Sequence, residues 1–347
     1  VILTLENHVS VPQQKVMAEQ FHEILGDHLY IPPKDSAKKP LPSPKELKNK
    51  VLLRGKKLQE DDDEYEEEEG KEVPSSHLPI HPHLSALIAL PSVKLSSNIY
   101  EDMQTHPQDG SPSLSESKVQ TLFDAHAPIP SYTAKRFVKS YPKGIRQDSS
   151  NFSPIPSWLL GVQSVALNFQ TADEDLDLNH GLFRVNGNCG YVLKPPTLLG
   201  GIDPRASPYP RFELHIAIIS AQYLPKSEPS KDIVDPYVSV EVFGVPKDEW
   251  KQKTRTVKDN GFNPVWNEPF KTRIYAPEVA ILRFTVKDFD STSSNDFVGE
   301  FTIPFASIRP GYSQIRLNTG YRHSPDESAS LFVRIAIDPI PPTPRPE

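Results

Sequence analysis

The sequence predicts a mixed α/β region followed by an all-β sandwich, and two patterns support this assignment. Short apolar runs alternate with helical spacings through residues 1–200. Residues 211–338 instead contain β-rich runs every ten to fifteen residues, with turn residues between them. Short strands at such spacing are typical of a sandwich. A length of 347 residues is enough for two domains of ordinary size.

Composition excludes several classes of protein. Proline makes up 37 of the 347 residues, against a usual share of about 5%, which argues against many long helices or a coiled coil. No run of ~18 apolar residues occurs, so no membrane-spanning helix is expected. A formal net charge of −7 argues against a general nucleic-acid binder. The single cysteine, Cys189, excludes an internal disulfide and suits the cytoplasm.

Residues 1–58 are expected to be folded. Residues 1–5 and 50–53 predict short strands, and residues 12–25 have helical spacing with Ser10 as the cap. The chain opens inside an apolar strand with no signal-peptide features, so we expect a fragment cut within a domain. The apolar side of the helix is predicted to carry Val16, Met17, Phe21, Ile24 and Leu25.

Residues 59–83 predict a disordered linker. Nine of the ten residues from Glu60 to Glu69 are acidic, and such a block repels itself and has nothing to bury. The linker also carries His77, His81 and His83. We interpret them as surface histidines rather than as a metal site.

Structure is expected to resume near Leu84 and to continue to residue 195. Residues 161–171 predict a strand, and residues 181–195 predict a strand, an Asn/Gly turn and a second strand. Residues 196–210 are rich in proline and glycine and predict an interdomain linker, and residues 339–347 predict a disordered tail.

Aspartates gather around the loops of the predicted sandwich. Asp235 follows an apolar pair, Asp288 and Asp290 flank a phenylalanine, and Asp259 and Asp296 lie in neighbouring segments. One interpretation is that these aspartates only stabilise turns, where aspartate is common. The other interpretation is that they bind calcium, which takes six to eight oxygen ligands from flexible loops.

The segments VDPYVSV, NGFNPVWNE and VKDFDSTSSNDFVGE together resemble the calcium-dependent C2 domain over residues 211–338. In that family, loop aspartates bind Ca²⁺ between the domain and anionic lipid headgroups. The resemblance implies a set of calcium ligands: Asp235, Asp288 and Asp290, with Asp259, Asp296 and the backbone carbonyl of Ile233 as further candidates.

The rest of the chain resembles the phosphoinositide-specific phospholipase C family, most like its delta-type subgroup. ENHVSVPQQKVMAE, LPSPKELKNKVLLRGKKL, VALNFQT and NGNCGYVLKP carry this resemblance in a fixed order. It implies a partial TIM-type (β/α)₈ barrel split by the acidic linker and followed by a C2 antiparallel β-sandwich. Residues 1–58 would end the X half of the barrel, residues 84–195 would form the Y half, and residues 211–338 would form the C2 domain.

The resemblance also implies an activity, the calcium-dependent hydrolysis of phosphatidylinositol 4,5-bisphosphate to diacylglycerol and inositol trisphosphate at the membrane surface. It gives Glu6 the role of a calcium ligand in the active site. It gives the other matching positions the role of holding phosphates or the inositol ring: Arg54, Lys56, Ser113, Lys139 and Tyr141.

Two kinds of departure from the family are visible. Arg54 stands where the family has lysine, and Lys139 stands where it has arginine, so charge is kept while phosphate geometry changes. The two catalytic histidines of the family lie upstream of this sequence, and His8, His22 and His28 do not match them. We therefore expect this chain to be inactive by itself.

Two questions remain open at this stage, the role of the acidic linker and the nature of the parent protein. The acidic linker is either an autoinhibitory segment, whose charge would be repelled by an anionic membrane, or a solvated spacer. The parent protein is either an active phospholipase or a catalytically silent homologue that binds membranes or inositol phosphates. A stand-alone C2 adaptor is the third interpretation, and it leaves residues 1–195 without a role.

Overall fold

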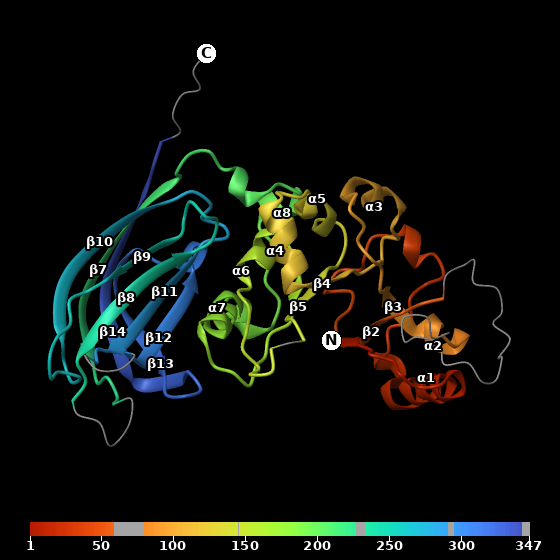
Figure 1. The fold of residues 1–347 in the computed structure, drawn as a ribbon, viewed down its shortest axis with the longest axis horizontal. Coiled ribbons are helices and arrows are strands. Elements are labelled where there is room, and N and C mark those ends of the chain that lie inside the picture. Colours follow the sequence, from red (N-terminus) through yellow and green to blue (C-terminus); the bar gives the residue numbers. More distant parts are fainter. Residues whose placement is uncertain (59–79, 145, 227–232, 291–294, 342–347) are drawn as a thin grey trace, which may run out of the picture. The chain divides into compact units, whose positions relative to one another are not determined.

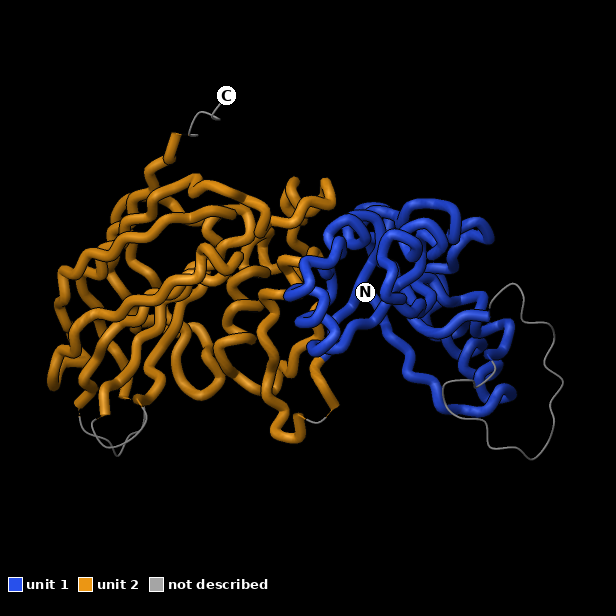
Figure 2. Tube along the Cα trace, turned by 45° about the horizontal axis from the view of Figure 1, so that its top comes forward, with its two compact units in different colours: residues 1–141, 162–164 blue, residues 142–161, 165–347 orange. Residues whose placement is uncertain are grey.

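The structure is a computed structural model that describes residues 1–58, 80–144, 146–226, 233–290 and 295–341. Contacts divide the chain into two compact units, the first made of residues 1–141 with 162–164 and the second of residues 142–161 with 165–347 (Figure 2). The acidic run that was predicted to be disordered lies outside the described residues.

Short parallel strands form the sheets that begin the chain (Figure 1). One sheet has the order β1-β2-β3 and another has the order β4-β5-β6, with parallel pairing of β1 to β2, β2 to β3 and β4 to β5. Parallel strands that alternate with helices belong to α/β barrels, which agrees with the predicted fold class. The strands are β1 (Ile2–Thr4), β2 (Leu52–Gly55), β3 (Ile88–Pro91), β4 (Ser113–Ser115), β5 (Lys139–Tyr141) and β6 (Ser164–Val165).

Eight α-helices are assigned among the described residues. Proline occupies N1 or N2 of α1, α2, α5, α6 and α8, where a missing N–H costs nothing. Short polar residues cap α1, α3, α4 and α7. The helices are α1 (Val11–Leu25), α2 (Pro82–Leu87), α3 (Ile99–Thr105), α4 (Glu116–Asp124), α5 (Ile129–Thr133), α6 (Ile155–Leu159), α7 (Glu174–Phe183) and α8 (Pro196–Leu199).

Helix α1 confirms the predicted helix and its cap. The Ser10 backbone N–H donates to the Gln13 side chain at 3.1 Å, as in a capping box. Met17, Phe21 and Leu25, spaced four apart, pack on a core cluster that includes Leu53 and Ile88. The predicted apolar face is wrong at two positions: side chains 16 and 24 lie beside this stripe and are exposed, Val16 by 51% and Ile24 by 78%.

Strand β2 is buried on both faces. Leu53 packs with α1 and α2, while Leu52 belongs to a second cluster with Leu90. Both-sided burial is characteristic of parallel strands in α/β folds. Because side chains alternate along a strand, Arg54 lies on the same face as Leu52.

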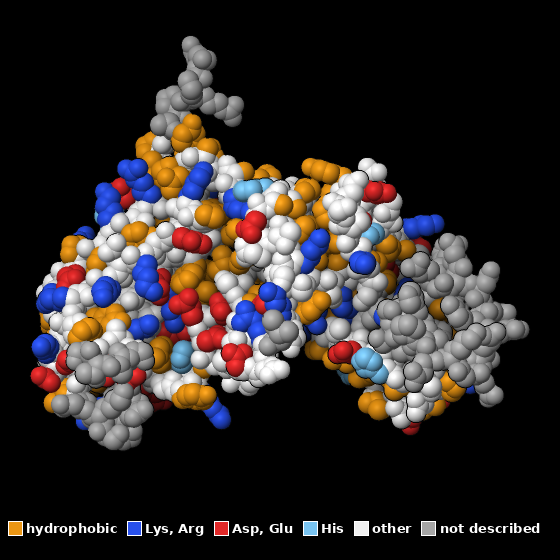
Figure 3. All heavy atoms as spheres, viewed as in Figure 1, with side chains coloured by type: hydrophobic (Ala, Val, Ile, Leu, Met, Phe, Trp, Pro, Cys, Tyr) orange, Lys and Arg blue, Asp and Glu red, His pale blue; other side chains and the backbone are white. Residues whose placement is uncertain are grey.

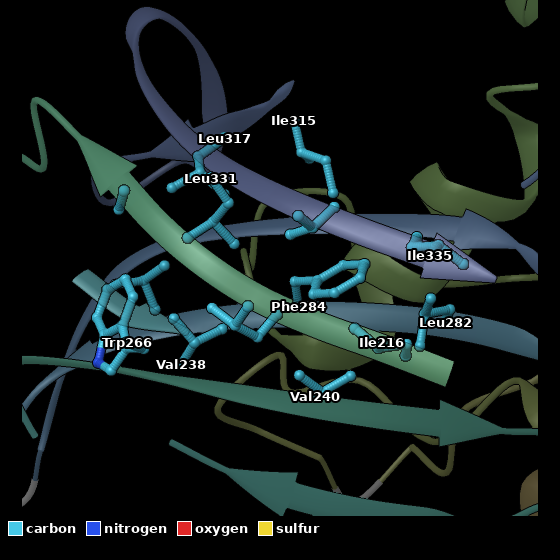
Figure 4. Packing of buried hydrophobic residues seen from close by; sticks show 14 of the residues in the cluster. Ile216, Val238, Val240, Trp266, Leu282, Phe284, Ile315, Leu317, Leu331 and Ile335 are labelled. Carbon is cyan, nitrogen blue, oxygen red and sulfur yellow. The ribbon is translucent and has the colours of Figure 1, made fainter. Parts of the chain in front are cut away.

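The second unit contains the antiparallel sandwich, whose strands connect in the order β10-β7-β14-β13-β12-β11-β8-β9. Its core is a single apolar cluster between the strands, with Phe284, Trp266 and Leu331 among its large members (Figure 4). This confirms the predicted β-sandwich. The strands are β7 (Phe212–Gln222), β8 (Pro236–Phe243), β9 (Trp250–Lys253), β10 (Val265–Ile274), β11 (Ile281–Asp288), β12 (Asp296–Pro304), β13 (Gly311–Thr319) and β14 (Ser324–Pro339).

Two strand predictions before the sandwich are wrong. Strand in residues 161–171 is limited to β6. Residues 181–183 end helix α7, Asn186–Asn188 form a 3₁₀ turn at the expected Asn/Gly turn, and residues 189–195 form no strand after it. The Asp173 side chain accepts the Leu176 N–H at 2.9 Å, so a well-capped helix runs through the segment that was read as a strand.

The sandwich also differs from the prediction at two places. Strand β10 was not predicted, because its polar positions hide the alternation of Trp266, Phe270 and Ile274. Pro339 was assigned to the disordered tail, yet it ends β14 opposite Phe212. Pro339 occupies the strand end, where a missing N–H is tolerated.

Candidate functional site

Polar side chains follow the carboxyl ends of the parallel strands in the first unit. Glu6 comes just after β1 and Lys56 just after β2, while Tyr141 ends β5. Ser113 and Lys139 are register partners across β4 and β5. In α/β barrels the active site lies at this edge of the strands. Glu6, Lys56 and Tyr141 therefore share this edge, whereas Ser113 and Lys139 begin β4 and β5.

Arg54 lies within β2 rather than in a loop after it, and its side chain is buried. Its Nε donates to Ser111 Oγ at 2.8 Å, and its Nη2 donates to Ser111 O at 2.6 Å and to Ser113 Oγ at 2.8 Å. Burial lowers the pKa of the guanidinium, which nonetheless keeps its charge. Arg54 thus ties β2 to the start of β4.

Lys139 is half-buried beside this arginine. Burial lowers the pKa of Lys139, the charge of Arg54 lowers it further, and the carboxylate of Glu6 opposes both effects. Because the charges of Arg54 and Glu6 both act on the pKa of Lys139, both groups lie near this lysine. The structure therefore brings Glu6, Arg54, Ser113 and Lys139 into one electrostatic neighbourhood.

Four of the predicted barrel residues are exposed: Glu6, Lys56, Ser113 and Tyr141. The Glu6 side chain is 89% exposed and its Oε1 lies 3.6 Å from His8 Nε2. The sequence reasoning did not assign His8 to the site, although its position two residues after Glu6 was a signal for it.

The loop aspartates of the sandwich meet at one end of the second unit. Asp235 Oδ1 accepts the Asp259 N–H at 2.7 Å, and the Asp235 N–H donates to Asp288 Oδ1 at 2.8 Å. Asp296 is the register partner of Asp288 across β11 and β12, and Asp290 lies two residues on. Three segments that are far apart in sequence are therefore joined through carboxylate-to-backbone hydrogen bonds.

The chemistry of this loop end suits calcium, because the five aspartates can supply carboxylate oxygens as ligands. Within the ranges that the structure describes, no three His, Cys, Asp or Glu side chains converge closely enough to hold a metal ion. Residues 227–232 and 291–294, which adjoin this end, lie outside those ranges. The residue types at this loop end therefore suit Ca²⁺, although the described carboxylates do not come together into a complete ligand cluster.

Exposed apolar side chains surround these aspartates, and the sequence reasoning missed them. Phe262 is 64% exposed and Tyr223 57% exposed, and their rings meet edge to face at 5.0 Å. Ile233 and Phe289 are exposed beside Asp235. The visible face of the sandwich carries acidic, basic and apolar side chains interspersed (Figure 3). Large apolar residues next to loop aspartates were the available signal.

The histidines of the linker have local roles where they are described. His81 Nδ1 accepts the His83 N–H at 3.1 Å at the start of α2, and the two rings meet edge to face. His77 lies outside the described residues. No helix in the described ranges is long and apolar enough to cross a bilayer.

Comparison with known families matches the chain in three consecutive segments. Residues 1–57 match the X domain of phosphatidylinositol-specific phospholipase C, residues 84–197 match its Y domain, and residues 212–319 match the C2 domain. The order agrees with the barrel strands and the sandwich. The chain belongs to the phosphatidylinositol-specific phospholipase C family.

Among curated relatives, the chain is similar to the delta-type members. It is 40% identical to 1-phosphatidylinositol 4,5-bisphosphate phosphodiesterase delta-4 of Xenopus laevis and 38% identical to delta-1 of Homo sapiens. Each match covers 97% of this chain and 49% of the relative, so the chain spans about half of their length. It is also 36% identical to inactive phospholipase C-like protein 1 of Mus musculus, over 97% of this chain and 33% of that protein.

A solved structure gives the same family at the level of the fold. The crystal structure of PLC21 from L. pealei superimposes with a TM-score of 0.81 and is 31% identical, covering 99% of this chain and 46% of that one. The predicted combination of a TIM-barrel part and a C2 sandwich is thereby confirmed.

Proposed function

We propose that the protein containing this chain is a phosphoinositide phospholipase C that hydrolyses phosphatidylinositol 4,5-bisphosphate to diacylglycerol and inositol trisphosphate. The observation that carries this proposal is the gathering of Glu6, Ser113 and Lys139 around Arg54 among the parallel strands. Relatives named for this activity are about 40% identical to the chain. The upstream residues that complete the site belong to the rest of the protein.

Each residue has a stated task in this proposal. Lys56 and Lys139 supply positive charge to the ring phosphates, the Ser113 hydroxyl donates to a phosphate oxygen, and Tyr141 packs on the inositol ring. Glu6 would hold Ca²⁺, which when bound lowers the cost of negative charge on the attacking inositol hydroxyl and on the phosphate.

The second unit would dock the protein on anionic membranes. Carboxylates of its loop end would hold Ca²⁺, and the exposed rings beside them would contact the lipid. We assign this role to Asp235, Asp288 and Asp290, with Asp259, Asp296 and the carbonyl of Ile233 as further ligands. The protein would then be cytoplasmic and peripheral, and the acidic linker would restrain access to the barrel site.

The test is calcium-dependent release of inositol trisphosphate from vesicles that contain phosphatidylinositol 4,5-bisphosphate, using the complete protein. Glu6→Gln should reduce release by at least about 100-fold, the scale on which a metal-assisted step depends on its ligand shell. Glu23→Gln, on the exposed side of α1, is the matched control and should leave release unchanged.

The second candidate function is a catalytically silent homologue. The similarity to a mouse protein named inactive favours it, as do the hydrogen bonds from Arg54 Nε and Nη2 to serine oxygens. Calcium-dependent vesicle binding without any release of inositol trisphosphate would establish this candidate and overturn the first.

A further inference from the structure

The buried guanidinium of Arg54 has an unusual set of partners. Its three hydrogen bonds go to two hydroxyls and one backbone carbonyl, all on Ser111 and Ser113. The residue is 3% exposed, whereas Ser113 is exposed. A ligand that arrives from solvent would therefore meet Ser113 first, with Arg54 behind it.

The contact with Arg54 constrains how the Ser113 hydroxyl is used. A serine hydroxyl has one proton and two acceptor lone pairs. One lone pair accepts the Arg54 Nη2–H at 2.8 Å, so the hydroxyl proton must point away from the guanidinium. Ser113 is thereby prepared to donate, which is the role that an anionic ligand requires.

The second anchor of Arg54 fixes this arrangement. Ser111 is fully buried, and it receives both the Nε–H and one Nη2–H of Arg54. A planar fork held at two points cannot swing toward solvent without breaking two buried hydrogen bonds. A lysine at this position would supply a single flexible ammonium and could not hold both serines in the same geometry.

We infer that Arg54 is a positioning residue, which orients the Ser113 hydroxyl as a donor to a phosphomonoester and does not itself bind the phosphate. This inference rests on the proposed function, because it takes a phosphorylated inositol ring as the ligand. It also reassigns the position that was expected to grip a ring phosphate directly. The phosphate source is either a lipid headgroup or a soluble inositol phosphate.

The test is a double-mutant cycle between Arg54 and Ser113, with inositol 1,4,5-trisphosphate binding to the complete protein measured by calorimetry. Ser113→Ala should weaken binding about tenfold, the loss of one hydrogen bond to a charged group. Arg54→Lys should weaken it by a similar factor, and the double variant should be little weaker than either single variant. Ser117→Ala, on the exposed side of α4, is the control.

Ser111→Ala provides a second variant that keeps both Arg54 and Ser113. It should weaken binding about threefold, and this effect should disappear when Ser113 is alanine. The same variants are measured on phosphatidylcholine vesicles with and without phosphatidylinositol 4,5-bisphosphate, in a calcium chelator. Coupling on vesicles alone identifies the lipid headgroup as the ligand, and coupling with the soluble probe as well extends it to free inositol phosphates.

Other outcomes overturn the inference in distinguishable ways. Wild-type binding with additive losses in the cycle would make Arg54 an independent ligand and would leave the proposed function intact. Unchanged or tighter binding in Arg54→Lys would do the same. A wild-type protein that binds neither the soluble probe nor the lipid would overturn both the inference and the proposed function.

Discussion

Two buried arginines of this protein have opposite surroundings. Arg54, in the barrel strands, donates to serine oxygens, and none of its hydrogen-bond partners is a carboxylate. Arg283, on β11 of the sandwich, contacts three carboxylates, with Nη–O distances of 2.9 Å to Glu174, 2.9 Å to Asp177 and 3.3 Å to Glu241. The positive charge of Arg54 therefore has no carboxylate among these partners, whereas the positive charge of Arg283 is surrounded by three carboxylates.

The difference shows in how each charge is held. Burial lowers the pKa of Arg283, but the carboxylates of Asp177, Glu174 and Glu241 more than reverse this effect. For Arg54 burial is the cause that acts, and it lowers the pKa. Removing a buried cation from among carboxylates destabilises the fold, because the carboxylate charges are then left buried and uncompensated. A buried cation among neutral oxygens keeps a positive field, which is useful where an anion binds.

The substitution with the largest expected effect removes Arg283 from its cluster of carboxylates. Arg283→Met removes the cation that all three carboxylates share, and Lys251 still pairs with Glu241 and His323 with Asp177. The buried negative charge left behind should lower the free energy of unfolding by about 3–5 kcal/mol. Urea denaturation followed by circular dichroism measures the loss. Arg273→Met, an exposed residue of β10, should change stability by less than about 0.5 kcal/mol. A loss of the same size in both variants would mean that the cluster contributes nothing.

The next prediction concerns the close packing of α7 against the sandwich, which brings the α7 carboxylates to Arg283. A Cβ on Gly181 would lie 2.3 Å from Thr302 Cγ2 and 3.0 Å from the Thr302 backbone carbon. Gly181→Ala should cost about 1–3 kcal/mol through overpacking, although alanine is the better helix former. Thr302→Ser, which removes the methyl group, should restore part of the loss.

Gly144→Ala is the control for this experiment, because nothing lies within 4 Å of the added Cβ. Its thermal unfolding should match that of the wild type. An unchanged melting temperature in Gly181→Ala would show that α7 can move away from β12 at no cost.

The smallest effect concerns Lys194, a partly buried cation that, unlike arginine, can lose its proton. Its Nζ donates to Gly161 O at 2.8 Å, and burial lowers its pKa from 10.5 to about 8. Between pH 8 and 10.5 the unfolded chain therefore binds more protons at this lysine than the folded chain does, so stability rises with pH in that window.

Lys194→Met should remove this slope. We expect the stability of the wild type relative to the variant to increase from pH 7.5 to pH 9.5 in denaturation experiments. Lys258→Met, at an exposed lysine, should run parallel to the wild type over the same range. Parallel curves for wild type and Lys194→Met would contradict the lowered pKa.

Local sequence patterns were sufficient where a structure depends on neighbours along the chain. Helix α1 begins at its predicted cap, and most sandwich strands lie where apolar alternation placed them. Local patterns failed at residues 181–195, where the cap at Asp173 and the packing of α7 outweighed a strand-like composition. They also failed at β10, whose polar side chains conceal its buried face.

The sequence by itself determined the order of the segments, the family and the residue types of the candidate site. The tertiary structure decided what Arg54 does, because its partners lie 57 and 59 residues away along the chain. It likewise decided that Arg283 meets carboxylates of α7 from more than 100 residues earlier. Whether a buried charge is neutralised or left to attract a ligand depends on distances that no local periodicity encodes.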